Sequence, residues 1–310
     1  MSDNDRRDAG LDTFPRYLMH HARQRPQQPA MREKEYGIWQ TYDWGQVADN
    51  VRAIACGLAK LGFKRGDRLA IVGDNRPRLY WSVMACQCLG GIPVMMYQDA
   101  VAQEMVYVLQ DAEVKFAIVE DQEQVDKMLE IAAETPLLQH VIYDDPRGLR
   151  KYDQPLLMAL DALQEAGRAW AQERPDFLDG EIAKGAPDDI SVMLYTSGTT
   201  GKPKGVCQTH EAFISAARGA IQFDALTERE DILSYLPMAW VGDHLFSFAQ
   251  ATVAGFTINC PESGETVMTD LREIGPTYYF APPRVFENLL TQVMIRMEDA
   301  SALKRGMFHH

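Results

Sequence analysis

The strongest constraint on the fold is a regular alternation of strand-like and helix-like segments between residues 68 and 143. We expect strands at 68–72, 92–97, 116–120 and 140–143, separated by helices at 77–89, 102–111 and 122–134. A strand, a helix and a second strand in this order give parallel pairing with a right-handed crossover. The sequence therefore predicts an α/β fold with mostly parallel sheets flanked by helices.

The remaining segments extend this pattern in both directions. Strands at 30–34 and 38–42 surround a Tyr-Gly pair typical of a hairpin, and Asp43 with Gln46 forms a capping box for the next helix. Further along the chain we expect helices at 156–172, 211–223, 266–274 and 283–299, and strands at 190–195, 231–236, 254–260 and 277–280. The predicted domains are residues 1–189, an α/β subdomain ending in a helical linker, and 190–310, which opens with the loop described next.

A loop rich in glycine, hydroxyl groups and lysine follows the strand at 190–195. Glycines let backbone N–H groups approach an anion closely, hydroxyls add hydrogen-bond donors, and lysine supplies a full positive charge. The residues that would provide these groups are Thr196, Ser197, Gly198, Thr199, Thr200, Gly201, Lys204 and Gly205. This composition predicts a cradle for a polyanion.

The loop is not a Walker motif. That motif needs four residues between its glycines and a Ser or Thr after its lysine, whereas two residues separate Gly198 from Gly201 and Pro203 follows Lys202. This disfavours an unrelated kinase or ATPase. A turn-rich surface loop is the simpler alternative, but the order of the eleven residues from Tyr195 to Gly205 is too particular for a generic turn.

The string Tyr-Thr-Ser-Gly-Thr-Thr-Gly-x-Pro-Lys-Gly at 195–205 resembles the signature of the AMP-forming acyl-CoA synthetase, adenylation-domain and luciferase superfamily, with Lys202 at the free position. Asn75, Arg76 and the stretch around Gln98 resemble the long-chain acyl-CoA synthetase branch. The loop alone does not separate the three kinds of enzyme, and the branch features favour an acyl-CoA synthetase. The resemblance implies the N-terminal portion of that fold.

The resemblance implies a two-step ligation. A carboxylate oxygen attacks the α-phosphorus of Mg·ATP and releases pyrophosphate, and the thiol of coenzyme A then displaces AMP from the acyl-adenylate to form a thioester. Positive charge and oriented N–H dipoles must offset the repulsion between the two anions. The implied roles are ATP binding by the loop, contact of Thr196 with Mg²⁺, and contact of Lys204 with the terminal phosphates.

The segment Leu-Pro-Met-Ala-Trp at 236–240 resembles the next motif of the family, which borders the acyl site, with Trp240 where a histidine is usual. Trp240 could line an apolar acyl tunnel or simply pack in the core. His244 could replace the missing imidazole or be a structural histidine. Apolar residues after Trp240 favour a medium- or long-chain fatty acid, and aromatic acids remain an alternative.

The family's later motifs, including its Mg²⁺-binding glutamate and its C-terminal catalytic lysine, are not matched within these residues. We therefore expect this chain to supply only the N-terminal part of a ligase. The alternative is a catalytically inactive homologue that acts as a binding module. Such a module would pair with another chain, or with a second copy of itself, through the apolar face left uncovered where the rest of the domain should be. The helix at 283–299 also has a broad apolar face, which must be buried somewhere.

Composition narrows the partners and the compartment. The formal charge of −13 argues against nucleic acid, since phosphate backbones need a basic face. The five cysteines lack paired spacing and indicate a reduced protein, not a disulfide frame or a zinc site. The polar N-terminus has no signal-peptide pattern, and no stretch is apolar for the roughly 18 residues of a membrane span. We expect a cytoplasmic protein, and the resemblance to acyl-CoA synthetases implies that its ligands are ATP, coenzyme A and a small carboxylic acid.

Overall fold

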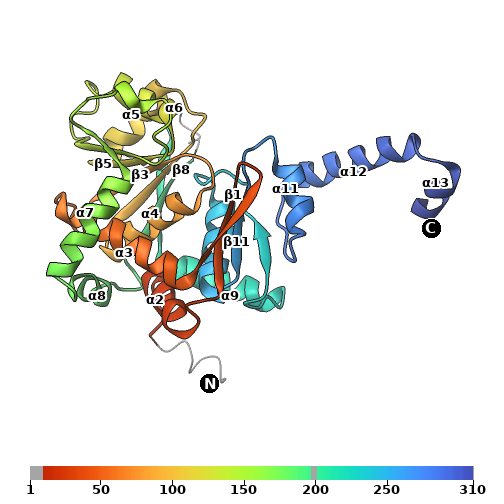
Figure 1. Cartoon of the computed structure of the whole chain (residues 1–310), viewed down its shortest axis with the longest axis horizontal. Coiled ribbons are helices and arrows are strands. Elements are labelled where there is room, and N and C mark those ends of the chain that lie inside the picture. Colours follow the sequence, from red (N-terminus) through yellow and green to blue (C-terminus); the bar gives the residue numbers. More distant parts are fainter. Residues whose placement is uncertain (1–9, 197–200, 310) are drawn as a thin grey trace. The chain divides into compact units, whose positions relative to one another are not determined.

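The computed structural model describes residues 10–196 and 201–309, which fall into two compact units, Met1–Thr277 and Tyr278–His310. The first unit carries the sheets and most of the helices (Figure 1). The predicted α/β architecture, with mostly parallel sheets flanked by helices, is confirmed.

The larger sheet contains seven strands within the described residues, in the order β7-β6-β5-β3-β4-β8-β9. The strands are β3 (Arg68–Val72), β4 (Ile92–Met96), β5 (Phe116–Val119), β6 (His140–Tyr143), β7 (Leu157–Ala159), β8 (Ile190–Thr196) and β9 (Lys204–Thr209). Every neighbouring pair is parallel except β8 with β9. The carboxyl ends of six strands therefore meet at one edge of the sheet.

Helices cover both faces of this sheet, as Figure 1 shows. Helices α5 (Ala102–Asp111) and α6 (Gln122–Glu130) lie on one side, and α3 (Trp44–Lys60), α4 (Pro77–Cys88) and α7 (Leu160–Glu173) on the other. Alternate strand residues point to opposite faces, so Ala70 and Val72 pack with Met105 and Leu109 of α5. This packing gives α5 a fixed position beside β8.

The smaller sheet has the order β10-β11-β1-β2 among the described residues. Its strands are β1 (Pro29–Glu35), β2 (Ile38–Asp43), β10 (Asp231–Leu233) and β11 (Thr257–Cys260). β1 and β2 form the predicted antiparallel hairpin, while β1 and β10 pair with β11 in parallel. The predicted capping box of α3 is confirmed, because Asp43 accepts from the Gln46 N–H and Gln46 accepts from the Asp43 N–H.

The remaining described helices complete the first unit. They are α2 (Phe14–Gln24), the 3₁₀ turn η1 (Leu149–Lys151), α8 (Phe177–Ala183), α9 (His210–Phe223), the π-helix η2 (Asp243–Ala249), α10 (Gln250–Ala254) and α11 (Val267–Ile274). None of the described helices combines the length and the hydropathy that a membrane crossing requires. The second unit consists of α12 (Pro283–Glu298) and α13 (Ala302–His309).

Five predicted elements need correction. The helix expected at 122–134 ends at Glu130, four residues early. The helix expected at 156–172 begins at Leu160, because its first residues form edge strand β7. The strand expected at 254–260 begins at Thr257, after a helical stretch that ends at Gly255 with φ +81°. The strand expected at 231–236 ends at Leu233, three residues early. No strand forms at 277–280, a segment bordered by prolines that cannot donate ladder hydrogen bonds.

Each sheet combines strands from both sides of residue 190. The larger sheet joins β3 to β7 with β8 and β9, and the smaller sheet joins β1 and β2 with β10 and β11. The boundary between domains 1–189 and 190–310 stays a prediction.

Arg76, at the end of β3, connects the two sheets. Its guanidinium donates 2.8 Å to Glu120 Oε1 after β5, and 2.8 and 2.9 Å to the carbonyls of Pro261 and Glu262 after β11. Burial raises the pKa of Glu120, and the Arg76 charge opposes that effect. The side chains of Arg76 and Glu120 are only 20% and 15% exposed, so this ion pair is shielded from solvent.

We predict that Arg76→Ala lowers the free energy of unfolding by about 2–4 kcal/mol, because it leaves the Glu120 carboxylate without its main partner. The matched control is Lys184→Ala, which removes an exposed pair with Glu181 and should cost less than about 1 kcal/mol. Urea denaturation of both variants measures the difference. Equal urea midpoints for the two variants would show that the contacts of Arg76 between the sheets add no more to stability than an exposed ion pair does.

Candidate functional site: the β8–β9 hairpin

The predicted phosphate loop connects the two strands of an antiparallel hairpin. Thr196, the last residue of β8, pairs with Lys204, the first residue of β9, and Tyr195 pairs with Gly205. Directly opposite residues of such a pair have Cβ atoms about 4.5–5.5 Å apart. The structure thus brings together Thr196 and Lys204, which the sequence predicted as the catalytic pair.

Both of these side chains are exposed at the carboxyl edge of the large sheet. Gly201 has φ +94°, a left-handed conformation that glycine adopts without strain. Lys204 makes no ion pair with any residue in the described part of the chain, so its ammonium is available to an anion. The predicted contacts of Ser197, Gly198, Thr199 and Thr200 lie outside the described residues.

Strand β9 was missed at the sequence level. Lys204 and Gly205 read as the end of a loop, and only the residues from Val206 to Thr209 favour a strand. The backbone groups of Lys204 and Gly205 find their hydrogen-bond partners in β8. This pairing between strands outweighs the local preference of these two residues for a loop.

Tyr195 lies on the face of the sheet that α5 covers. It is 8% exposed, and its hydroxyl donates 2.7 Å to Asp111 Oδ2 at the end of α5. A Cβ at Gly205 would lie 3.1 Å from both Met193 Sδ and Tyr195 Cζ. The glycine therefore admits the tyrosine ring across the hairpin.

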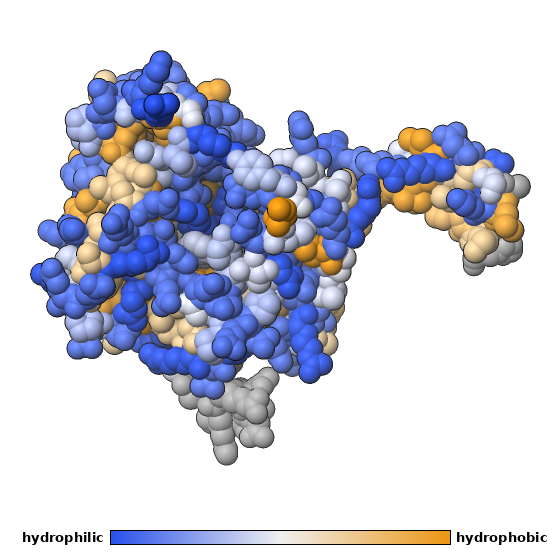
Figure 2. Space-filling view, viewed as in Figure 1, coloured by the Kyte–Doolittle hydropathy of each residue, from blue (hydrophilic) through white to orange (hydrophobic). Residues whose placement is uncertain are grey.

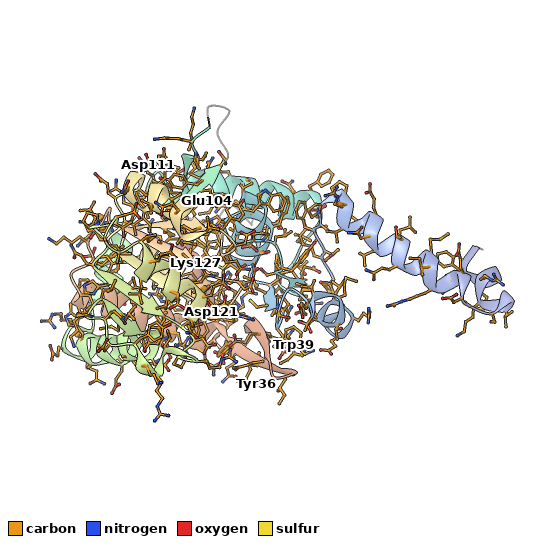
Figure 3. The ribbon with its side chains drawn as sticks, turned by 90° about the horizontal axis from the view of Figure 1, so that it is seen from above. Tyr36, Trp39, Glu104, Asp111, Asp121 and Lys127 are labelled. Carbon is orange, nitrogen blue, oxygen red and sulfur yellow. The ribbon has the colours of Figure 1, made fainter. Side chains whose placement is uncertain are left out.

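A second contact with α5 comes from the loop itself, shortly before β9. The Lys202 Nζ lies 5.3 Å from the centre of the Tyr107 ring, and the Tyr107 hydroxyl donates 3.4 Å to Asp111 Oδ1. Figure 3 labels Asp111 and Glu104 near the two ends of α5, with Lys127 on the neighbouring helix α6. Sequence analysis predicted this helix but not its role. The only available signal was the i, i+4 spacing of Tyr107 and Asp111.

Asn75 and Gln98, which carry the resemblance to the long-chain acyl-CoA synthetase branch, also follow strands at the carboxyl edge of the larger sheet. Gln98, after β4, donates to Asp74 Oδ1 after β3, and its own carbonyl accepts from Gln124 and Lys127 of α6. Asn75 donates to Ser234 Oγ at 2.9 Å and to Asp243 Oδ1 at 3.0 Å. These side chains tie strand ends together.

Asp243 is the centre of a buried polar network. Its carboxylate also accepts hydrogen bonds from the hydroxyls of Tyr80, at 2.8 Å, and Ser234, at 3.0 Å. Complete burial raises the pKa of Asp243 to about 7 despite these donors. Burial also raises the pKa of Tyr80. The network links the end of β3, α4, β10 and η2.

His244 lies in an aromatic cluster, not at an open site. Its ring is 4.7 Å from that of Phe213 and 4.8 Å from that of Phe248, and the residue is 3% exposed. Burial lowers its pKa to about 3, so the imidazole is neutral near pH 7. Trp240 lies one turn earlier, half-buried, with its ring over Gly242. Substrate binding by Trp240 and His244 stays a prediction.

The described residues contain no group of three or more His, Cys, Asp or Glu side chains placed to hold a metal ion. The exposed hydroxyl of Thr196 could serve as a single oxygen ligand of a divalent cation. Mg²⁺ commonly takes one or two protein ligands and completes its shell with water and substrate phosphates. A single hydroxyl ligand is compatible with that pattern, and the contact of Thr196 with Mg²⁺ stays a prediction.

The chain belongs to the AMP-binding enzyme family, whose pattern it matches over residues 18–308. It is 28% identical over 278 residues to the long-chain-fatty-acid–CoA ligase ACSBG1 of Rattus norvegicus, covering 87% of this chain and 38% of that relative. It is also 28% identical over 282 residues to FadD15 of Mycobacterium bovis, a ligase of the same description, covering 90% and 45%. The chain thus spans about two fifths of the length of these relatives.

Two solved structures support the fold. The anthranilate CoA ligase AuaEII, in complex with anthranoyl-AMP, superposes with a TM-score of 0.75 at 18% identity, covering 87% of this chain and 49% of that one. The N-terminal domain of FACL13 from Mycobacterium tuberculosis gives 0.69 at 23% identity, covering 84% and 61%. At these identities the likeness establishes the fold alone.

We predict that Asp243→Asn changes the pH dependence of stability. An acid whose folded pKa exceeds its unfolded value binds more protons when folded, so its contribution to stability falls as pH rises from about 4 to about 7. The amide cannot ionise. The unfolding free energy of the variant relative to the native chain should therefore increase across this window, by on the order of 3 kcal/mol.

Denaturant titrations at several pH values measure this difference. Asp144, whose pKa is also raised to about 7 by burial, titrates in both proteins and cancels in the comparison. A difference that stays constant from pH 4 to 7 would show that Asp243 ionises at its ordinary pKa.

Proposed function

We propose that the β8–β9 hairpin binds the phosphates of Mg·ATP, and that the chain serves in the AMP-forming activation of a carboxylic acid and its transfer to coenzyme A. The observation that carries the proposal is the pairing of Thr196 with Lys204, both exposed, at the mouth of the loop. Membership of the AMP-binding enzyme family supports it.

The chemistry requires a positive site beside the triphosphate. When a carboxylate oxygen bonds to the α-phosphorus, the bond to the bridging oxygen breaks and pyrophosphate leaves with the electron pair. Lys204 would stabilise the charge that develops on this leaving group, because its ammonium is paired with no described residue and the β8–β9 pairing places its backbone opposite Thr196. Thr196 would orient the phosphates from the opposite strand.

Mg²⁺, when bound with ATP, supplies charge neutralisation on the phosphate oxygens. In this chain the Thr196 hydroxyl would hold it. A neutral ligand leaves the positive charges of Mg²⁺ and of Lys204, directly opposite, available to offset the charge of the triphosphate.

We infer that the acid is a medium- or long-chain fatty acid. Relatives such as the rat and mycobacterial ligases are described as long-chain-fatty-acid–CoA ligases, and this supports an alkyl substrate. The similarity in fold to an anthranilate CoA ligase keeps an aromatic acid as the alternative. A cytoplasmic location and a role of Trp240 beside the acyl chain belong to the same proposal.

We predict that Lys204→Ala weakens Mg·ATP binding about 10- to 100-fold, the usual effect of losing a charged hydrogen-bond donor, and that Thr196→Ala weakens it less. Isothermal titration calorimetry measures both. Lys60→Ala is the matched control, since Lys60 is an exposed lysine at the end of α3. The control should bind like the native chain.

A pyrophosphate-release assay with a panel of fatty and aromatic acids, run on the same samples, separates binding from turnover. Release with a fatty acid would support the ligase reaction by this chain. An absence of Mg·ATP binding by the native chain, or equal binding by all variants, would contradict a phosphate-binding role for the hairpin.

A second candidate function is that of a binding module that associates with a second copy of the chain. Within the unit Tyr278–His310, no side chain of α12 is buried, although Phe286, Leu290 and Met294 recur at helical spacing. Figure 2 shows hydrophobic residues along these helices. An uncovered apolar stripe of this kind favours association.

If this face mediates association, the double variant Leu290→Glu/Met294→Glu should shift the chain toward monomer in sedimentation velocity. The variant Asn288→Glu/Gln292→Glu is the matched control, because it adds the same charges at the same spacing to exposed polar positions. A native chain that is monomeric at all concentrations would contradict the module hypothesis.

A further inference from the structure

Helix α5 contacts the hairpin before the loop and within it. Before the loop, the Tyr195 hydroxyl donates 2.7 Å to Asp111. Within the loop, the Lys202 ammonium lies 5.3 Å from the centre of the Tyr107 ring. The Tyr107 hydroxyl also donates to Asp111, at 3.4 Å, so the two contacts share one carboxylate.

The position of Asp111 is unfavourable for a helix taken alone. It is the last residue of α5, where the negative end of the helix dipole repels a carboxylate. Two hydroxyl donors offset that repulsion. The Tyr195 hydroxyl in turn needs an acceptor, because the residue is 8% exposed and a buried polar group without a partner is costly.

Lys202 occupies the position of the loop motif that carries no fixed residue type. Its ammonium lies over the Tyr107 ring, whereas Lys204 has no described ion-pair partner. Attraction between a cation and the face of an aromatic ring is substantial at such distances. The two lysines therefore differ in their contacts. The Lys202 ammonium packs on Tyr107 of α5, whereas the Lys204 ammonium is available to bind a ligand.

We propose that Tyr107, Asp111, Tyr195 and Lys202 form a clamp, here called the α5 clamp, that positions the phosphate loop for Mg·ATP. The four are positioning residues, since they act through Thr196 and Lys204. The proposal rests on the proposed function of the hairpin. It adds that α5, a helix outside the loop motif, sets the affinity of the loop for phosphate.

A double-mutant cycle tests the clamp. The variants are Lys202→Gln, Tyr107→Leu and the two combined, with Tyr107→Phe as the matched control that keeps the ring. One readout is the rate at which trypsin cuts after Lys204, identified by mass spectrometry. Proline at 203 protects the bond after Lys202, and proteolysis reports local opening. The second readout is the dissociation constant of Mg·ATP.

We expect each single variant to raise both the cleavage rate and the dissociation constant about two- to fivefold, the effect of losing one exposed cation–aromatic contact. The combined variant should be no worse than either single one, because both remove the same contact. Tyr107→Phe keeps the ring under the Lys202 ammonium and removes only the 3.4 Å hydrogen bond to Asp111, so it should raise both quantities less than Tyr107→Leu does.

The other half of the clamp is tested by Asp111→Asn, Tyr195→Phe and their combination. Asp111 is exposed and the phenylalanine keeps the ring, so both variants should fold, and circular dichroism checks this. We expect each single variant to raise the cleavage rate and the dissociation constant of Mg·ATP about two- to tenfold. The combined variant should again be no worse than either single one.

Three results would overturn the clamp. Additive effects in either cycle would show that the paired residues act independently. A loss of affinity with Lys202→Gln but not with Tyr107→Leu would place Lys202 on the phosphates. Unchanged cleavage in all variants would show that α5 does not hold the loop. If the native chain binds no Mg·ATP, the proposed function fails, and the cleavage cycles still decide whether the clamp exists.

Discussion

The guanidinium of Arg76 holds the carboxyl edges of the two sheets together, and the geometry of the candidate site depends on that joint. It reaches Glu120 in the larger sheet and two carbonyls after β11 in the smaller one. Thr196 is the last residue of β8 in the larger sheet, whereas Trp240 follows β10 of the smaller one. The phosphate hairpin and the expected acyl segment are therefore set relative to each other by a shielded ion pair and by the buried network around Asp243.

Local signals predicted the regular parts of the fold. The strand at 68–72, the helix at 102–111 and the strand at 140–143 have the expected bounds, because hydrophobic spacing and turn residues agree there with the tertiary structure. Strand β9 and the short strand β7 were missed, since each depends on pairing with a neighbour that a local pattern does not contain. The π-helix η2 was missed for the same reason, as its buried His244 and Phe248 are packed by distant aromatic residues.

The candidate site also combines residues that the local sequence identifies with residues that only the tertiary structure identifies. Thr196 and Lys204 could be chosen as candidates from the sequence, because the glycines, hydroxyls and lysines of the loop form one contiguous string. The structure adds that these two residues are paired across the hairpin, and their role stays a prediction. Tyr107 and Asp111 could not be chosen in this way, because their importance comes from where α5 lies against β8, nearly a hundred residues later in the chain. His244 was expected beside a ligand or in the core, and the structure surrounds it with aromatic rings that keep it neutral. The burial of a side chain decides between these two interpretations, and the sequence alone does not give it.

The central claim is that the hairpin at 190–209 binds the phosphates of ATP. Amide hydrogen exchange followed by mass spectrometry, with and without saturating Mg·ATP, tests it most directly. The account predicts slower exchange in peptides covering β8 and β9, and unchanged exchange in the β1–β2 hairpin at the far side of the smaller sheet. Slower exchange elsewhere with none in 190–209, or no change at all, would contradict it.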